Sequence, residues 1–216
     1  LASADWLAQE TRDKAIVKLN TITPHIGYPE KLPETYTKKI IDKSLSLVEN
    51  AQNLAKISIA HSWSKWNKPV DRSEWHMPAH MVNAYYDPQQ NQIVFPAAIL
   101  QAPFYSLEQS SSANYGGIGA VIAHEISHAF DTNGASFDEN GSLNNWWQEA
   151  DYKAFTERTD KIVEQFDGLD SYGAKVNGKL TVSENVADLG GVACALEAAK
   201  QDDDFSARDF FINFAT

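Results

Sequence analysis

The 216-residue sequence has little of what marks several large protein classes. With one cysteine, Cys194, the chain cannot form an internal disulfide. This fits a protein in a reducing compartment or a fold large enough to be stable without disulfide bonds. The apolar run around this cysteine predicts a buried structural thiol. No stretch reaches the roughly 18 continuous apolar residues of a membrane span. Basic residues are few, 18 against 29 acidic ones, and the formal net charge of -11 argues against nucleic acid and anionic membranes as main partners.

The remaining composition is that of an ordinary globular chain, with 43% hydrophobic and 11% aromatic residues. Two β-prone stretches, Met81–Tyr86 and Gln92–Phe95, flank a turn and predict a β-hairpin. A loop or second hairpin is predicted over residues 168–180, which are rich in glycine and asparagine. The final residues, 207–216, are amphipathic and stop without a capping signal, so we expect the natural chain to continue beyond Thr216. Helical spacing of apolar residues predicts helices over residues 2–19, 35–63, 120–130, 146–166 and 181–200.

The stretch from Val121 to Phe130 places three ionisable side chains in an otherwise apolar helix. His124 and His128 are four residues apart and share a helix face, so their imidazoles can converge on one metal ion. Glu125 is rotated by about 100° from His124 and can reach a water held by the metal. This is the H-E-x-x-H arrangement of zinc peptidases. The alternative is a pair of core histidines bonded to backbone carbonyls, but three buried ionisable groups need a common partner.

A catalytic zinc ion needs a third protein ligand and an open fourth position. Glu184 and Asp188 are also four residues apart, on one face of the last long predicted helix. In one interpretation Glu184 binds the metal, and Asp188 accepts the spare ring N–H of a ligating histidine and so fixes its tautomer. In the other, Thr181 and Glu184 form a capping box and Asp188 is only solvated. Spacing alone does not decide between these interpretations.

The predicted strand that contains Asn83 and Ala84 is a candidate binding edge. An edge strand presents free backbone groups, so an extended peptide can bind by adding as another strand. The Asn83 side chain can then supply a further hydrogen bond. The alternative is an ordinary sheet edge that binds nothing.

Five motifs follow one another in the sequence: Asn83-Ala-Tyr-Tyr86, Asn91-Gln-Ile-Val-Phe-Pro-Ala97, Asn114-Tyr-Gly-Gly-Ile-Gly119, His124-Glu-Ile-Ser-His128-Ala-Phe-Asp131 and Ser183-Glu-Asn-Val-Ala-Asp188. Together they resemble the neprilysin family of zinc metallopeptidases, peptidase family M13, over about Trp6 to Phe214. The lack of cysteine pairs is more similar to the bacterial oligopeptidase branch than to the disulfide-rich animal ectoenzymes. That branch implies a cytoplasmic bacterial protein, with a secreted or cell-surface protein as the alternative.

The resemblance implies an α+β fold, mainly helical with a small β-sheet, of the thermolysin-like zincin (gluzincin) kind. It divides the chain into a helical segment of residues 1–70 and a C-terminally truncated catalytic domain of residues 71–216. Family members are roughly three times this length, with a large helical domain that restricts substrate size. The family also places a transition-state-stabilising histidine and a substrate-binding arginine beyond this stretch. The alternative function is therefore an inactive zinc-binding fragment that acts as a binding module.

The resemblance also assigns roles in the site. It implies one Zn²⁺ per chain, held by His124, His128 and Glu184. Glu125 is implied as the catalytic carboxylate, the general base of a zinc endopeptidase, and Asp188 as the partner of a ligating histidine. The implied substrates are oligopeptides, whose backbone would contact the two residues of the candidate binding edge, Asn83 and Ala84.

Overall fold

The computed structural model describes residues 4–216, so the start of the first predicted helix, residues 2–3, lies outside the described residues. Contacts divide the chain into two compact units. The first comprises the chain up to Gly27 together with Met77–Thr216, and the second comprises Tyr28–His76. The domain boundary near residue 70 stays a prediction, but the elements before Gly27 pack with the second half of the chain.

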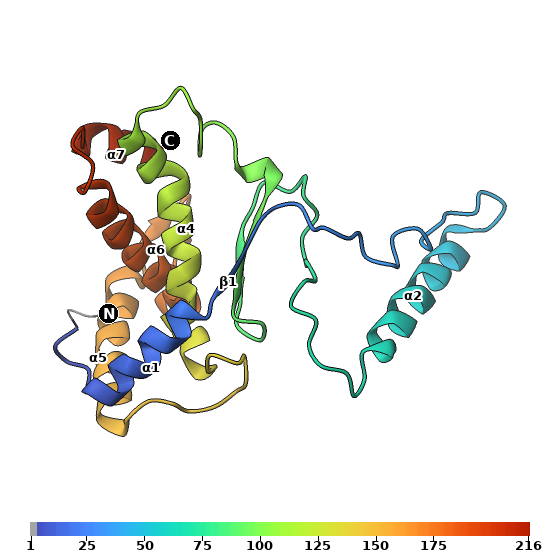
Figure 1. Ribbon diagram of the computed structural model, residues 1–216, viewed down its shortest axis with the longest axis horizontal. Helices are drawn as coiled ribbons and strands as arrows, with labels where there is room; N and C mark the ends of the chain where they lie inside the picture. The colour runs from blue at the N-terminus through green and yellow to red at the C-terminus, as the bar shows by residue number, and fades with distance from the viewer. Residues whose placement is uncertain (1–3) are drawn as a thin grey trace. The chain divides into compact units, whose positions relative to one another are not determined.

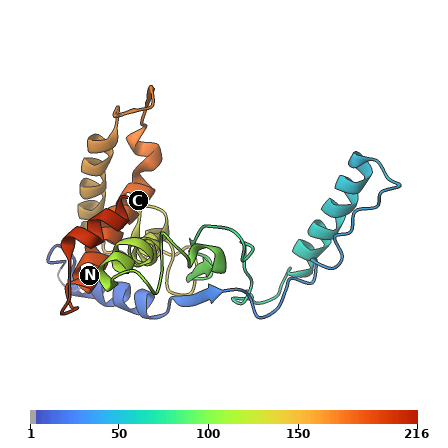
Figure 2. The ribbon, with the colours of Figure 1, turned by 90° about the horizontal axis from the view of Figure 1, so that it is seen from above.

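The first unit contains six of the seven α-helices of the described residues (Figures 1 and 2). These helices are α1 (Gln9–Asn20), α3 (Ser111–Asn114), α4 (Ala120–Ser127), α5 (Glu149–Phe166), α6 (Gly178–Ala199) and α7 (Ala207–Phe214). A π-helical turn, Tyr115–Gly119, leads into α4, and a 3-10 turn, His128–Phe130, follows it. Helices α5 and α6 run side by side, joined by the predicted hairpin, which is confirmed as β4 (Asp170–Ser171) and β5 (Ala174–Lys175).

The main sheet has three strands in the order β1–β3–β2. Strand β1 (Thr23–Gly27) pairs in parallel with β3 (Gln92–Pro96), and β2 (Tyr85–Asp87) pairs with β3 in an antiparallel hairpin. The predicted hairpin is thus confirmed, but its first strand begins at Tyr85 rather than 81. The Asn83 N–H instead bonds to the Met81 carbonyl in a bend, so Asn83 and Ala84 precede the strand. Strand β2 forms one edge of the sheet.

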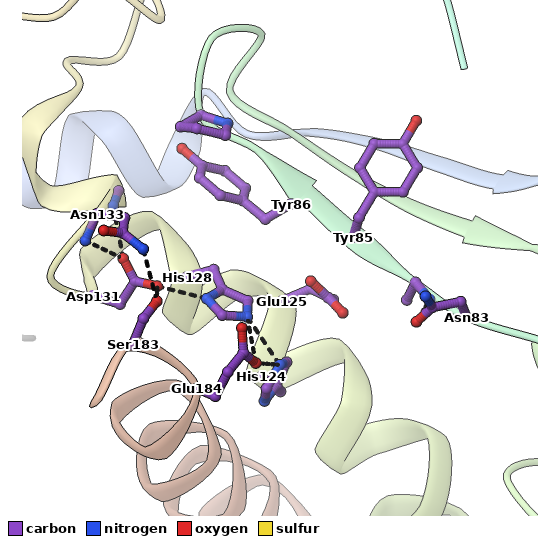
Figure 3. Close-up of a pocket in the computed structure, with 13 residues that line it drawn as sticks. Asn83, Tyr85, Tyr86, His124, Glu125, His128, Asp131, Asn133, Ser183 and Glu184 are labelled. Carbon is purple, nitrogen blue, oxygen red and sulfur yellow. Dashed lines mark hydrogen bonds and ion pairs between the residues drawn. The ribbon is translucent and has the colours of Figure 1, made fainter. Parts of the chain in front are cut away.

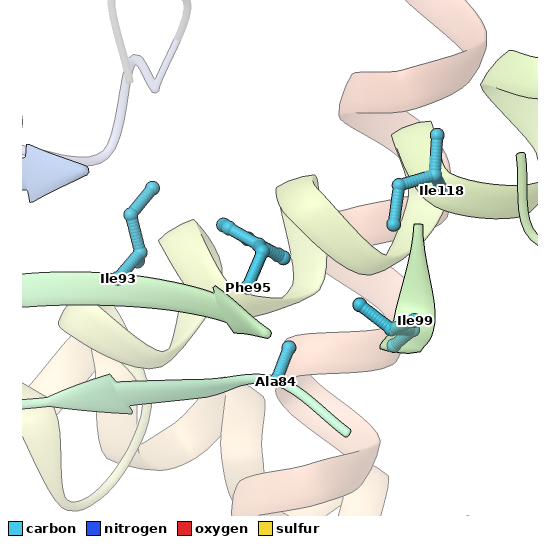
Figure 4. Packing of buried hydrophobic residues seen from close by; sticks show 5 residues of the cluster. All are labelled: Ala84, Ile93, Phe95, Ile99 and Ile118. Carbon is cyan, nitrogen blue, oxygen red and sulfur yellow. The ribbon is translucent and has the colours of Figure 1, made fainter. Parts of the chain in front are cut away.

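The central strand β3 is buried along its whole length because it has a neighbour on each side. Its side chains Ile93 and Phe95 pack into a cluster with Ala84, Ile99 and Ile118 (Figure 4). Ile118 comes from the turn that leads into α4, so this cluster fastens the hairpin to the helix that carries His124 and His128.

Helices α4 and α6 approach each other closely, because small residues line their contact. A methyl group added at Gly191 would lie 2.8 Å from the backbone nitrogen of His124 and 2.9 Å from its Cα. At neighbouring Gly190 an added methyl would chiefly meet the Ser127 hydroxyl, at 2.7 Å. Backbone cannot move aside as a hydroxyl can, so Gly191 sets the separation of the two helices.

We therefore expect Gly191→Ala to lower the free energy of unfolding and Gly190→Ala not to lower it. Forcing a methyl into a packed contact typically costs about 1–3 kcal/mol. The same substitution gains up to about 1 kcal/mol of helix propensity, which at Gly190 should offset the small cost of turning the Ser127 hydroxyl aside. Urea unfolding followed by circular dichroism measures both variants. Equal stability of the two variants would contradict the close approach at Gly191.

The second unit contains helix α2 (Leu47–Ser64), and the predicted helix over residues 35–63 is wrong over residues 35–46. Ser46 accepts a hydrogen bond from the Glu49 N–H, and the Glu49 carboxylate accepts one from the Ser46 N–H at 2.9 Å. This capping box starts the helix at Leu47. The preceding residues form turns.

Other helices also differ from the predictions. Helix α1 begins at Gln9, and α5 begins at Glu149 rather than at residue 146, after an extended Gln148. The indoles of Trp146 and Trp147 precede the helix and donate to the carbonyl oxygens of Phe137 and Ala135, each at 3.0 Å. The predicted burial of Cys194 is wrong, since this thiol is exposed on α6. Within residues 4–216, the helices lack the combination of length and apolarity that crossing a bilayer requires.

Candidate metal centre

A cavity of about 510 Å³ is bordered by β2, α4 and the first turns of α6. Six of the seven predicted site residues line it: Asn83, Ala84, His124, Glu125, His128 and Glu184 (Figure 3). The seventh, Asp188, lies behind His124. Residues more than a hundred positions apart in the sequence, such as Asn83 and Glu184, are therefore brought together at one cavity.

Three donor atoms from two helices converge in this cavity. The Nε2 atoms of His124 and His128 are 2.9 Å apart, and Glu184 Oε2 lies 3.5 Å from each of them. Tetrahedral zinc with bonds of about 2.0–2.1 Å places its ligand atoms about 3.3 Å apart. The triangle of donors has nearly this size, so the three side chains fit one zinc ion.

The second nitrogen of each imidazole bonds to a carboxylate. His124 Nδ1 lies 2.7 Å from Asp188 Oδ1, and His128 Nδ1 lies 2.6 Å from Asp131 Oδ2. In the neutral tautomer that donates Nδ1–H to these carboxylates, each Nε2 has a free lone pair and faces the other Nε2 and the Glu184 oxygen. Two lone pairs and a carboxylate that face one another are stabilised by a cation between them.

The same carboxylates change the pKa values of the histidines. The hydrogen bond with Asp188 raises the pKa of His124 against the opposing effect of burial. Burial lowers the pKa of His128, but the hydrogen bond and the charge of Asp131 outweigh it and the pKa is raised. In both cases a carboxylate bonded to Nδ1 favours proton or metal binding by the imidazole.

Asp131 is a site residue to which the sequence analysis assigns no role. It is 2% exposed, and its Oδ1 accepts N–H bonds from Asn133 at 2.7 Å and Gly134 at 2.6 Å. Its Oδ2 also accepts the Ser183 hydroxyl at 2.5 Å. Burial alone would raise the pKa of Asp131, but these bonds and His128 lower it, so the carboxylate stays ionised. Its position three residues after His128, the second histidine of the motif, is the sequence feature that could have predicted this contact.

Glu125 lies on the side of the histidines that faces β2, whereas Glu184 approaches from α6 (Figure 3). Its side chain is buried, and burial raises its pKa against the lowering effects of the two histidines and of a backbone hydrogen bond with Tyr86. Its donor atom lies within 4.8 Å of those of His124 and His128. Both glutamates are thus near the histidines, but Glu184 is the closer and completes the zinc-sized triangle.

The start of helix α6 bears on the two interpretations of Glu184 and Asp188 that the sequence left open. Helix α6 begins at Gly178, and the Asn177 side chain caps it by accepting from the Leu180 N–H at 3.0 Å. Thr181 lies inside the helix, so the capping-box interpretation of Thr181 and Glu184 is wrong.

At the candidate binding edge, the Ala84 N–H donates to Asn83 Oδ1 at 2.9 Å, with Asn83 exposed and Ala84 buried.

Known proteins resemble this chain closely. A relative from Streptococcus gordonii, described provisionally as a zinc metalloproteinase, is 78% identical over 97% of the chain. The neutral endopeptidase of Lactococcus lactis is 57% identical over 100% of it. The chain covers 37% and 34% of these two relatives, so it spans about a third of their length.

Structure and family comparisons agree with these relatives. The crystal structure of PepO from Lactobacillus rhamnosis matches with a TM-score of 0.89 and 46% identity, over 97% of this chain and 34% of that one. This match confirms the predicted α+β, mainly helical zincin fold class. The family model described as Peptidase family M13 matches residues 83–214, which include the cavity and both helices of the donor triangle. The chain belongs to peptidase family M13.

Proposed function

We propose that this chain carries the zinc ligands and the general base of an endopeptidase that hydrolyses oligopeptides. The convergence of His124 Nε2, His128 Nε2 and Glu184 Oε2 on one zinc-sized triangle, beside the buried carboxylate of Glu125, carries the proposal. Zinc bound by three protein ligands polarises a carbonyl and lowers the pKa of a water in its open position toward neutrality. The family name and the neutral endopeptidase relative support this reaction class.

The protein groups have separate tasks in this mechanism. His124, His128 and Glu184 hold the metal, and Asp188 and Asp131 orient the two imidazoles through Nδ1. Glu125 takes the proton of the attacking water and then delivers it to the leaving amine.

The peptide would lie along the edge formed by β2 and the two residues before it. Among the residues that the structure describes, strand β2 pairs with β3 and lies at the edge of the sheet, where an extended peptide can add as another strand. Asn83 is exposed there and can turn its amide from its own backbone to the substrate. A second cavity of about 380 Å³ adjoins Asn83 and Glu125 and continues to Phe104, Val121 and Val192. This mainly apolar cavity suits an apolar side chain next to the cleaved bond.

The other function class is a binding module in which zinc only fastens α4 to α6. A structural zinc site usually has four protein ligands and a closed shell. In the part of the chain that the structure describes, the donor triangle opens onto a cavity that also contains a buried carboxylate. That arrangement favours the enzyme. A cytoplasmic location stays a prediction from cysteine usage.

Metal removal tests the proposal. The purified protein is expected to contain about one zinc per chain, as the donor triangle has room for one ion. Because the chain spans about a third of its relatives, peptide cleavage is assayed on the longest natural protein that contains it. A chelator should abolish cleavage, and added zinc should restore it. Protein without zinc, or cleavage that persists in chelator, would contradict the proposed function.

A further inference from the structure

Lys18 is a buried cation that the mechanism above does not use. It lies on α1, and its side chain is 1% exposed. Its ammonium group donates hydrogen bonds to the carbonyl oxygens of Ala129, Gly134 and Phe137, each at 2.7 Å. All three carbonyls belong to residues 128–137, which follow α4 and which we call the connector. One side chain thus spans the connector from its second residue to its last.

The contact requires the charged form of lysine. An ammonium group has three N–H donors and here all three are used, whereas a neutral amine has two and would turn a lone pair toward a carbonyl. Burial lowers the pKa of Lys18 to about 8, against the raising effect of the nearby Asp131, Asp138 and Glu139. Desolvation therefore outweighs attraction at this position, and burying such a charge is not a gain in stability by itself. Three carbonyl oxygens and the rings of Tyr86, Phe130 and Trp146, which lie within 6.0 Å of the ammonium group, replace its lost hydration, and the same bonds hold the connector in one arrangement.

The connector holds the carboxylate that orients His128. Gly134 joins the two sets of contacts, because its N–H donates to Asp131 Oδ1 and its carbonyl accepts from Lys18. Ala129, the first residue bound by Lys18, directly follows His128. The turn is also closed tightly, since a methyl group at Gly134 would lie 1.9 Å from the His128 carbonyl oxygen. Lys18 therefore fixes the turn on both sides of Asp131.

We propose that Lys18 is a positioning residue for the metal centre, which acts by holding Asp131 where its carboxylate orients the His128 imidazole. The proposal rests on the proposed function, in which His128 binds zinc. Helix α1, more than a hundred residues before the motif, thereby becomes part of the support of the site. Without the ammonium group, the Ala129 carbonyl loses the donor that Lys18 provides, while the Gly134 and Phe137 carbonyls keep only the Phe137 N–H and the Trp146 indole N–H. The connector then relaxes, and Asp131 no longer fixes His128 Nδ1.

The test measures zinc affinity by competition with a chelator of known affinity. Lys18→Met keeps the length of the side chain and removes the charge and the donors. We expect it to weaken zinc binding by about 10- to 100-fold, the usual effect of losing an outer partner of a ligand. Lys14→Met is the matched control, one turn earlier on the same helix and exposed, and should bind zinc like the wild type. Unfolding of the zinc-free proteins is measured alongside.

A double-mutant cycle with Asp131→Asn separates positioning from simple loss of stability. If Lys18 acts through Asp131, Lys18→Met should have little further effect on zinc affinity in the Asp131→Asn protein. Full additivity, or wild-type affinity in a Lys18→Met protein whose only change is lower stability, would overturn the proposal. Should Lys18→Met not fold, Lys18→Gln takes its place in the cycle. Wild-type protein that binds no zinc would instead contradict the proposed function.

Discussion

Replacing Glu125 with glutamine is expected to abolish peptide cleavage and to leave zinc bound. Glutamine has nearly the same shape as glutamate, so the packing against β2 should survive, but its amide cannot take the proton of the attacking water. General acid–base groups contribute about 10²- to 10⁴-fold to a rate, and kcat should fall by that order. The measurement combines peptide-cleavage kinetics with the zinc content of the same preparation.

The matched control is Glu157→Gln, which makes the same chemical change at an exposed position on α5. It should retain both activity and zinc. A Glu125→Gln protein that keeps kcat within about tenfold of the wild type would exclude Glu125 as the general base. Loss of zinc together with activity would point to a different role, because Glu125 also lies within 4.8 Å of both histidine donors. Glu125 would then be a ligand.

Local geometry explains which parts of the site could be predicted from the sequence alone. His124 and His128 must share a face once the segment is helical, because the helical repeat places residues four apart in neighbouring positions. The β-hairpin was predictable for a similar reason, since two β-prone stretches flank a turn at Asn91. The start of α2 was predictable too, as Ser46 and Glu49 have the spacing of a capping box, and the error there came from overlooking it.

Tertiary contacts explain what could not be predicted. Spacing left the role of Glu184 open, because its distance to the histidines depends on how closely α6 approaches α4 at Gly191. The resemblance to the family supplied that assignment in advance of the structure. Neither a motif nor the family resemblance marked Lys18 as part of the site. A lysine on an amphipathic helix normally faces solvent, and its burial here depends on the path of the connector more than a hundred residues later.

Replacing Glu184 with glutamine is expected to cause the largest loss of zinc affinity among single substitutions on α6. In the proposed site, Glu184 supplies the negatively charged ligand, and a neutral amide oxygen is a much weaker ligand for zinc. Two imidazoles then remain, so the dissociation constant should rise by more than the roughly 10- to 100-fold that follows loss of an outer partner. Asp188→Asn, which changes such a partner of His124, should fall within that smaller range.

The two variants and a control form a graded series on one helix. Glu197→Gln is the control, since Glu197 is exposed on α6 and pairs with Lys200 at 2.6 Å, away from the cavity. Chelator competition should rank the rise in dissociation constant as Glu184→Gln, then Asp188→Asn, with Glu197→Gln equal to the wild type. If Glu184→Gln and Asp188→Asn have equal effects, Glu184 does not bind the metal directly and acts, like Asp188, through another ligand. Glu125, whose donor atom lies within 4.8 Å of those of His124 and His128, would then be the candidate for the third ligand.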